Sequence, residues 1–68
     1  MELHVPTDLS VKAMASVVGY ITDGLDAVVL RHEVSTKHAG SVHLVLTGNA
    51  RDLEIARQRA EKLGGVTD

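Results

Sequence analysis

Two alternating apolar segments joined by a short polar turn limit the possible folds of this chain more than any other feature. Residues 25–34 read LDAVVLRHEV, and residues 41–47 read SVHLVLT. Alternation of this kind is typical of half-buried β-strands. The intervening STKHAG has the composition of a turn. The pattern therefore predicts a β-hairpin. The side chains expected toward the core are Val28, Leu30, His32, Val34, Val42, Leu44 and Leu46.

A short strand and a helix are predicted before this hairpin. Residues 2–5, ELHV, alternate, and Pro6 ends the strand because proline cannot donate to a ladder. The segment TDLSVKAMASVVGYITDG places apolar residues at helical spacing between a cap at Thr7 or Asp8 and a stop at Gly24. The chain therefore begins with a strand followed by a helix.

A second helix is predicted after the hairpin, in GNARDLEIARQRAEKLGG. Asn49 is a suitable N-cap, and Asp52 stands in the first turn, where the helix dipole favours a negative charge. Gly64 and Gly65 end the helix. The following VTD is long enough only for the start of a fourth strand.

The predicted order is β-α-β-β-α with a vestigial fourth strand. Residues 1–68 form a single domain, since the chain is too short for two. This order and the right-handed crossover rule predict an α+β, ferredoxin-like fold, with two helices on one face of an antiparallel sheet. The predicted core is Met14, Val18, Ile21, Leu30, Leu44, Leu46, Leu53 and Leu63.

In element order the chain resembles the small ferredoxin-like regulatory modules, ACT domains above all. PTDLSVKAMASVVGYI corresponds to their first turn and first helix, and GSVHLVLTGNARDLEIARQRAEKLGG to their third strand and second helix. ACT domains usually carry a glycine where the first helix starts, whereas this chain has DLSVK. The resemblance thus implies a regulatory architecture that pairs with other chains, but it assigns no effector-binding residue.

Composition restricts the partners and the chemistry. There is no cysteine, which excludes disulfides and thiolate metal sites, and Tyr20 is the only aromatic residue among Phe, Trp and Tyr. A net charge of −2 with a single aromatic residue predicts no nucleic-acid partner. The first residues, MELHVPTDLS, lack the basic and apolar regions of a signal peptide, and no apolar run approaches a membrane span. We therefore expect a cytoplasmic protein.

Self-association is expected from the small core and from the short fourth strand. A chain of this length buries only about 60% of its unfolded surface, and partner subunits are a common additional source of stability. The first strand is predicted to keep an unpaired edge, which would recruit another chain. The predicted partners are further copies of the chain and a larger protein.

Strand alternation separates the histidines of RHEVSTKHAGSVH. His32 is predicted on the helix-facing side, His38 in the turn and His43 on the opposite side, so these three should not bind one metal ion. Because the first and third strands are neighbours in this fold, His4 and His43 should lie close together. The predicted ligand-binding residues on the helix-free face are His4, Arg31, Glu33 and His43.

No catalytic residue, metal site or cofactor is predicted. No serine stands in a glycine elbow of the hydrolase type, and the histidine spacings match no compact metal motif. The sequence therefore favours a non-catalytic regulatory or assembly module that associates with itself or with a larger enzyme or regulator. The alternative is a small enzyme or metal-dependent protein whose site forms at a subunit interface around the four residues named above.

Overall fold

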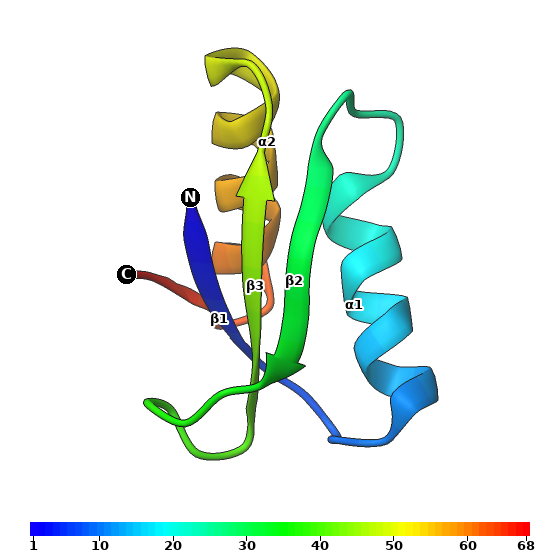
Figure 1. The fold of residues 1–68 in the computed structure, drawn as a ribbon, viewed down its shortest axis with the longest axis vertical. Coiled ribbons are helices and arrows are strands. Elements are labelled where there is room, and N and C mark those ends of the chain that lie inside the picture. The colour runs from blue at the N-terminus through cyan, green and yellow to red at the C-terminus, as the bar shows by residue number, and fades with distance from the viewer.

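The computed structural model describes residues 1–68 and contains the predicted elements in the predicted order. The strands form one antiparallel sheet in the order β2-β3-β1-β4, and both helices cover one face of it (Figure 1). The α+β, ferredoxin-like prediction is confirmed, including the very short fourth strand. The elements are β1 (Glu2–Pro6), α1 (Val11–Thr22), β2 (Val28–Val34), β3 (Ser41–Thr47), α2 (Ala50–Lys62) and β4 (Val66–Thr67).

The core lies between the sheet and the two helices, and it is built from aliphatic side chains alone. Of the predicted core, Met14, Ile21, Leu44 and Leu46 are buried, and Val18 and Leu53 pack against them partly buried. The prediction that Leu63 is buried is wrong. Leu63 is the C-cap of α2, beyond the last full turn, and is 39% exposed. The nine buried members are Leu3, Val5, Met14, Ile21, Val42, Leu44, Leu46, Ala56 and Ala60.

A β-bulge in β2 overturns the prediction that Leu30 is buried. Val29 lies opposite Leu46 and Arg31 lies opposite Val45, so Leu30 is an extra residue without a partner in β3. An inserted residue changes which face the preceding side chains occupy. Val29 consequently packs against the core, while Leu30 is 64% exposed.

The helix ends are partly as predicted. Asn49 caps α2 as expected, and its side chain accepts the N–H of Asp52 at 2.9 Å. For α1 the N-cap is Ser10 instead of Thr7 or Asp8, and its hydroxyl accepts the N–H of Ala13 at 3.1 Å. The helix is therefore capped at Ser10, two to three residues after the predicted caps.

The two edges of the sheet differ from the predicted arrangement. Val66 and Thr67 pair with His4 and Leu3, and the Asp68 N–H donates to the Glu2 carbonyl at 3.0 Å. The predicted unpaired edge on the first strand is therefore wrong, since the end of the described chain covers it. The other edge is β2, which pairs only with β3. Neither helix has the length and apolar character needed to span a membrane.

Candidate functional site

The helix-free face of the sheet holds the four residues predicted to form a ligand site. His4 lies directly opposite His43 in the pairing of β1 with β3, and Glu33 lies opposite His43 in the pairing of β2 with β3. Arg31 is two residues from Glu33 along β2, on the same face. The sheet therefore brings together residues that are far apart in the sequence.

Three imidazole rings are in contact on this face. The rings of His4 and His43 are stacked, with centroids 4.4 Å apart and an interplanar angle of 7°. The ring of His38 approaches the ring of His4 to 4.6 Å at an angle of 49°. His4 is 3% exposed as a result, although it lies on the face that no helix covers.

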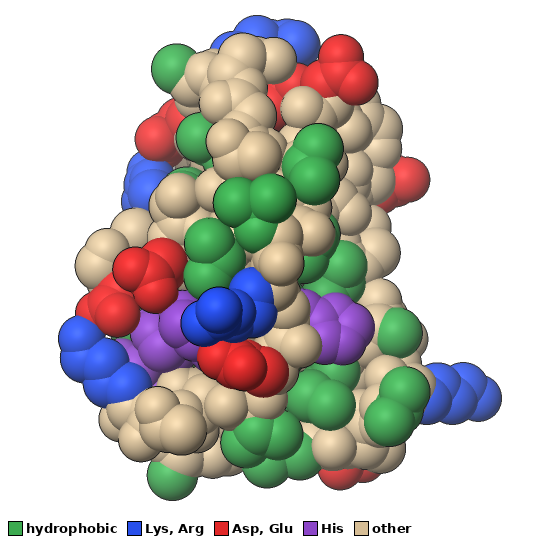
Figure 2. All heavy atoms as spheres, in the orientation of Figure 1, with side chains coloured by type: hydrophobic (Ala, Val, Ile, Leu, Met, Phe, Trp, Pro, Cys, Tyr) green, Lys and Arg blue, Asp and Glu red, His purple; other side chains and the backbone are tan.

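The predicted positions of His32 on the helix-facing side and of His38 in the turn are confirmed, but the contact between His38 and His4 was not predicted. His32 lies opposite the core residue Leu44 in the strand pairing. Its side chain is exposed and takes no part in the stack. His38 does lie in the turn, but the turn folds over the helix-free face. Figure 2 shows the histidine side chains in two separate groups, with acidic and basic side chains around the larger group.

Ser35 causes the turn to fold in this way. Its hydroxyl oxygen accepts the N–H groups of His38 at 2.9 Å and Lys37 at 3.2 Å. A hydroxyl has two lone pairs and one proton, so the proton remains for the third neighbour, Nδ1 of His4 at 2.7 Å. We assign Nδ1 of His4 as the acceptor and Nε2 as the protonated nitrogen, from this network of bonds.

The side-chain carboxylate of Asp68 completes the network. Nε2 of His4 lies 3.3 Å from Oδ2 of Asp68, and Lys37 forms a salt bridge with Oδ1 of the same residue. The bond to Lys37 and then the bond to His4 hold the pKa of the Asp68 carboxyl below its ordinary value. This network ties the β2–β3 turn and the residues after β4 to the middle of β1.

The series Ser35, His4 and Asp68 contains the residue types of a hydrolase triad, but it is not arranged for nucleophilic attack. A nucleophilic serine needs a free lone pair directed at a substrate. Both lone pairs of Ser35 accept backbone N–H groups, and the residue is 6% exposed. The geometry assigns these three residues to fixing the turn.

His43 lies between two carboxylates. Its Nε2 is 2.8 Å from Oε1 of Glu2, a hydrogen bond, and its Nδ1 is 3.7 Å from Oε1 of Glu33. Nη1 of Arg31 lies 3.8 Å from the same Glu33 oxygen. Of the four predicted residues, Glu33 therefore lies between His43 and Arg31, and all three share this face with the buried His4.

A metal ion does not fit between the stacked rings. The lone pairs of imidazole nitrogens lie in the plane of the ring, so two nearly parallel rings direct them along parallel lines instead of toward one point. Both nitrogens of His4 also face groups of the chain itself. No three histidine, aspartate or glutamate side chains are grouped so that they could hold a metal ion.

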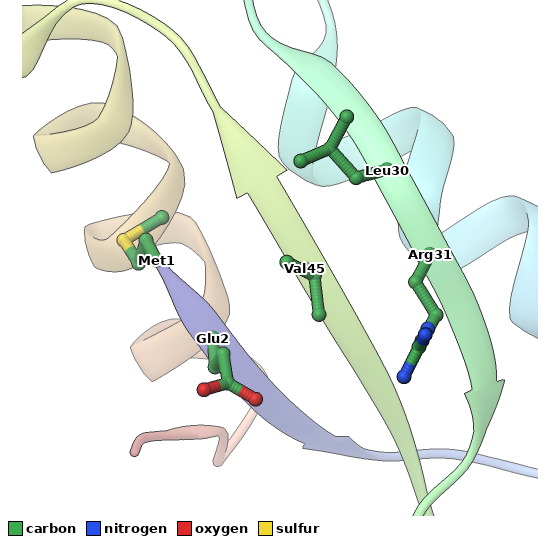
Figure 3. A pocket seen from close by; sticks show the side chains of 5 residues that line it. All are labelled: Met1, Glu2, Leu30, Arg31 and Val45. Carbon is green, nitrogen blue, oxygen red and sulfur yellow. The ribbon is translucent and has the colours of Figure 1, made fainter.

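An open groove lies beside this network. Its volume is about 510 Å³, and its walls come from β1, β2 and β3 (Figure 3). Apolar side chains make most of the lining, with one carboxylate and one guanidinium. The exposed Leu30 of the bulge forms part of the wall. The lining residues are Met1, Glu2, Leu30, Arg31 and Val45.

Sequence reasoning missed Ser35, Lys37 and Asp68 as members of the network. Asp68 is 64 positions from His4, and no periodicity connects residues at such a distance. The only available signal was the serine at the start of the predicted turn, since serine commonly bonds to the backbone two or three residues onward.

Comparisons with known proteins found no counterpart: no family model, curated protein or solved structure matches this chain.

Proposed function

We propose that this chain is a non-catalytic regulatory or assembly module that works by associating with other protein chains, its own copies first. The observation that carries the proposal is the exposed edge of the sheet. On β2, Val28 is 57% exposed, Leu30 64% and Val34 49%. A strand edge with unpaired backbone groups and apolar side chains is a template for another strand.

The helix-free face supports a structural role for its polar residues. The contacts of His4, Ser35 and Asp68 are made within the chain, and no buried side-chain nitrogen or oxygen lacks a hydrogen-bond partner. Catalytic groups, in contrast, are usually directed into a pocket where a substrate can reach them. The regulatory part of the proposal is supported by the resemblance of the element order to ACT domains.

Sedimentation velocity over a wide concentration range tests the proposal. We expect the wild-type chain to associate as its concentration rises, and Leu30→Lys to remain monomeric, because a lysine on an edge strand blocks pairing. Leu63→Lys is the matched control, since Leu63 is also an exposed leucine but lies at the end of α2. A wild-type chain that stays monomeric up to near-millimolar concentration would contradict self-association.

The second candidate is a ligand or metal site at a subunit boundary around His4, Arg31, Glu33 and His43. The proximity of His43 to Glu2, Glu33 and the groove favours it. Calorimetric titration of zinc and nickel is the test. Binding that disappears in His43→Ala but persists in the exposed His32→Ala would support this second function, and equal heats in both variants would count against it.

A further inference from the structure

The exposed edge of β2 carries a charge pattern that identifies a partner. We propose that β2 pairs antiparallel with β2 of a second copy of this chain, about a two-fold axis at His32. The inference rests on the proposed assembly role and adds to it the partner, the strand and the register. The two sheets then become one continuous sheet.

The backbone of β2 limits the registers available. The Ser35 N–H points toward β3, since it donates to the Ser41 carbonyl at 2.9 Å. Successive N–H groups along a strand point to alternate sides, so those of Val34 and His32 point away from β3, toward the open edge. A partner strand must bond to these even-numbered residues. In a pair of identical strands this places the two-fold axis on a residue instead of between two residues.

The charges then select one axis. An axis at Arg31 would place two arginines opposite each other, and an axis at Glu33 would place two glutamates opposite each other. Like charges directly opposite across a strand pair are destabilising, and opposite charges are stabilising. An axis at His32 places Arg31 opposite the partner's Glu33, and by symmetry Glu33 opposite the partner's Arg31.

These two side chains are available to a partner. Within one chain, Arg31 and Glu33 approach only to 3.8 Å, and their side chains are 63% and 52% exposed. An exposed pair of this kind contributes little within one chain. Pairing both charged groups with a second copy therefore costs the single chain little stability.

The same register also covers apolar surface. Residues 30–34 read LRHEV, with a leucine at one end and a valine at the other. About an axis at His32, the backbone of Leu30 lies next to that of the partner's Val34, so both exposed apolar residues stand at the seam and each loses accessible surface to the partner strand.

Two further features favour a second copy over an unrelated strand. The order cation, histidine, anion is complementary to itself when the strand is reversed, whereas a foreign strand would have to carry the same order by chance. In addition, β1 is already covered by β4 in each copy. Pairing through β2 therefore uses the long open edge of both chains, and the assembly closes as a dimer.

Charge reversal tests the register. Arg31→Glu leaves two acidic side chains at the edge, and Glu33→Arg leaves two basic ones. Each variant alone is expected to raise the dimer dissociation constant by about tenfold or more, because both contacts change from attraction to repulsion. An equimolar mixture of the two variants is expected to form a heterodimer, since every acidic group then faces a basic one.

Native mass spectrometry distinguishes the heterodimer from either homodimer, and sedimentation velocity gives the dissociation constants. Two further samples complete the set. The double variant R31E/E33R should dimerise like the wild type, because its order of charges is reversed but still self-complementary. Arg51→Glu, the same change of charge at an exposed position on α2, should leave the dimer unchanged.

The outcomes separate this inference from the proposed function. A wild-type dimer that neither single reversal weakens would overturn the β2 register and leave self-association standing. A failure of the two variants to form a heterodimer when mixed, with circular dichroism showing both folded, would also overturn it. A wild-type chain that is monomeric at every concentration would overturn both proposals.

Discussion

β2 and β3 are neighbours in the sequence and in the sheet, yet their environments are opposite. Each has seven residues and a similar share of valine and leucine. Val42, Leu44 and Leu46 of β3 are at most 1% exposed, whereas Val28 and Leu30 of β2 are more than half exposed. Composition is therefore a poor guide to the burial of a strand, and position in the sheet is a better one.

The difference has a physical cause. β3 lies between β2 and β1, so both of its edges are hydrogen-bonded and its apolar side faces the helices. β2 has β3 on one side only, and its bulge turns Leu30 out of the core. One strand of the hairpin thus supplies most of its apolar side chains to the core, while the other forms an exposed edge of the sheet.

The largest expected effect is on β3. Leu44→Ala should lower the free energy of unfolding by about 2–5 kcal/mol, because it removes a fully buried side chain and leaves a cavity. Urea denaturation measures the change. A loss below about 0.5 kcal/mol, the range of surface substitutions, would mean that β3 is not the buried strand.

A smaller effect is expected in the turn that joins the two strands. His4→Ala removes the acceptor for the Ser35 hydroxyl and should cost about 1–3 kcal/mol, the penalty for leaving a buried polar group unpaired. The amides of Lys37 and His38 should also exchange faster with solvent, because Ser35 holds both.

His32→Ala is the control for this prediction. It removes a histidine that is exposed on β2 and lies outside the stack, so it should change stability by less than about 0.5 kcal/mol. Equal losses in the two variants would show that the imidazole network does not hold the turn.

The pH dependence of stability should come in part from Asp68, next to the same turn. Its pKa is lower in the folded chain than in the unfolded chain, mainly through Lys37 and then His4. The stabilisation is therefore complete above the ordinary aspartate pKa and is lost as the pH falls through the lowered folded value. Denaturation at neutral and acidic pH should show that the free energy of unfolding falls less with acidification in Asp68→Asn than in the wild type.

Asp8→Asn provides the comparison at an exposed aspartate without such partners, and it should follow the wild-type pH profile. Glu54 on α2 also has a lowered pKa, owing to its bond with Arg57, and contributes in the same acidic range. The difference between Asp68→Asn and the wild type removes this shared contribution. Identical profiles for these two proteins would contradict a folded-state bond to Asp68.

The smallest effect on folding is expected on β2. Leu30→Ala should change the stability of the monomer by less than about 0.5 kcal/mol, because Leu30 is 64% exposed. The measurement needs a concentration at which the chain does not associate, since a partner adds its own stabilisation. A loss as large as that of Leu44→Ala would remove the distinction between the two strands.

The sequence by itself determined the elements and their order. Alternation in residues 41–47, the Asn49 cap and the glycines that end the helices act within a few residues of the chain, so local patterns predict them. The pairing of the first and third strands followed from topology, and it correctly placed His4 beside His43. These predictions needed no knowledge of how side chains pack.

Only the tertiary structure decided which positions are buried and which residues complete the histidine network. The bulge at Leu30 is one extra residue in an otherwise regular pattern, and it changes the face of the residues before it. Asp68 reaches His4 because β4 pairs with β1, and His38 reaches His4 because Ser35 bonds to the turn backbone. Contacts between residues so far apart in the chain depend on the complete fold, and local propensity therefore cannot predict them.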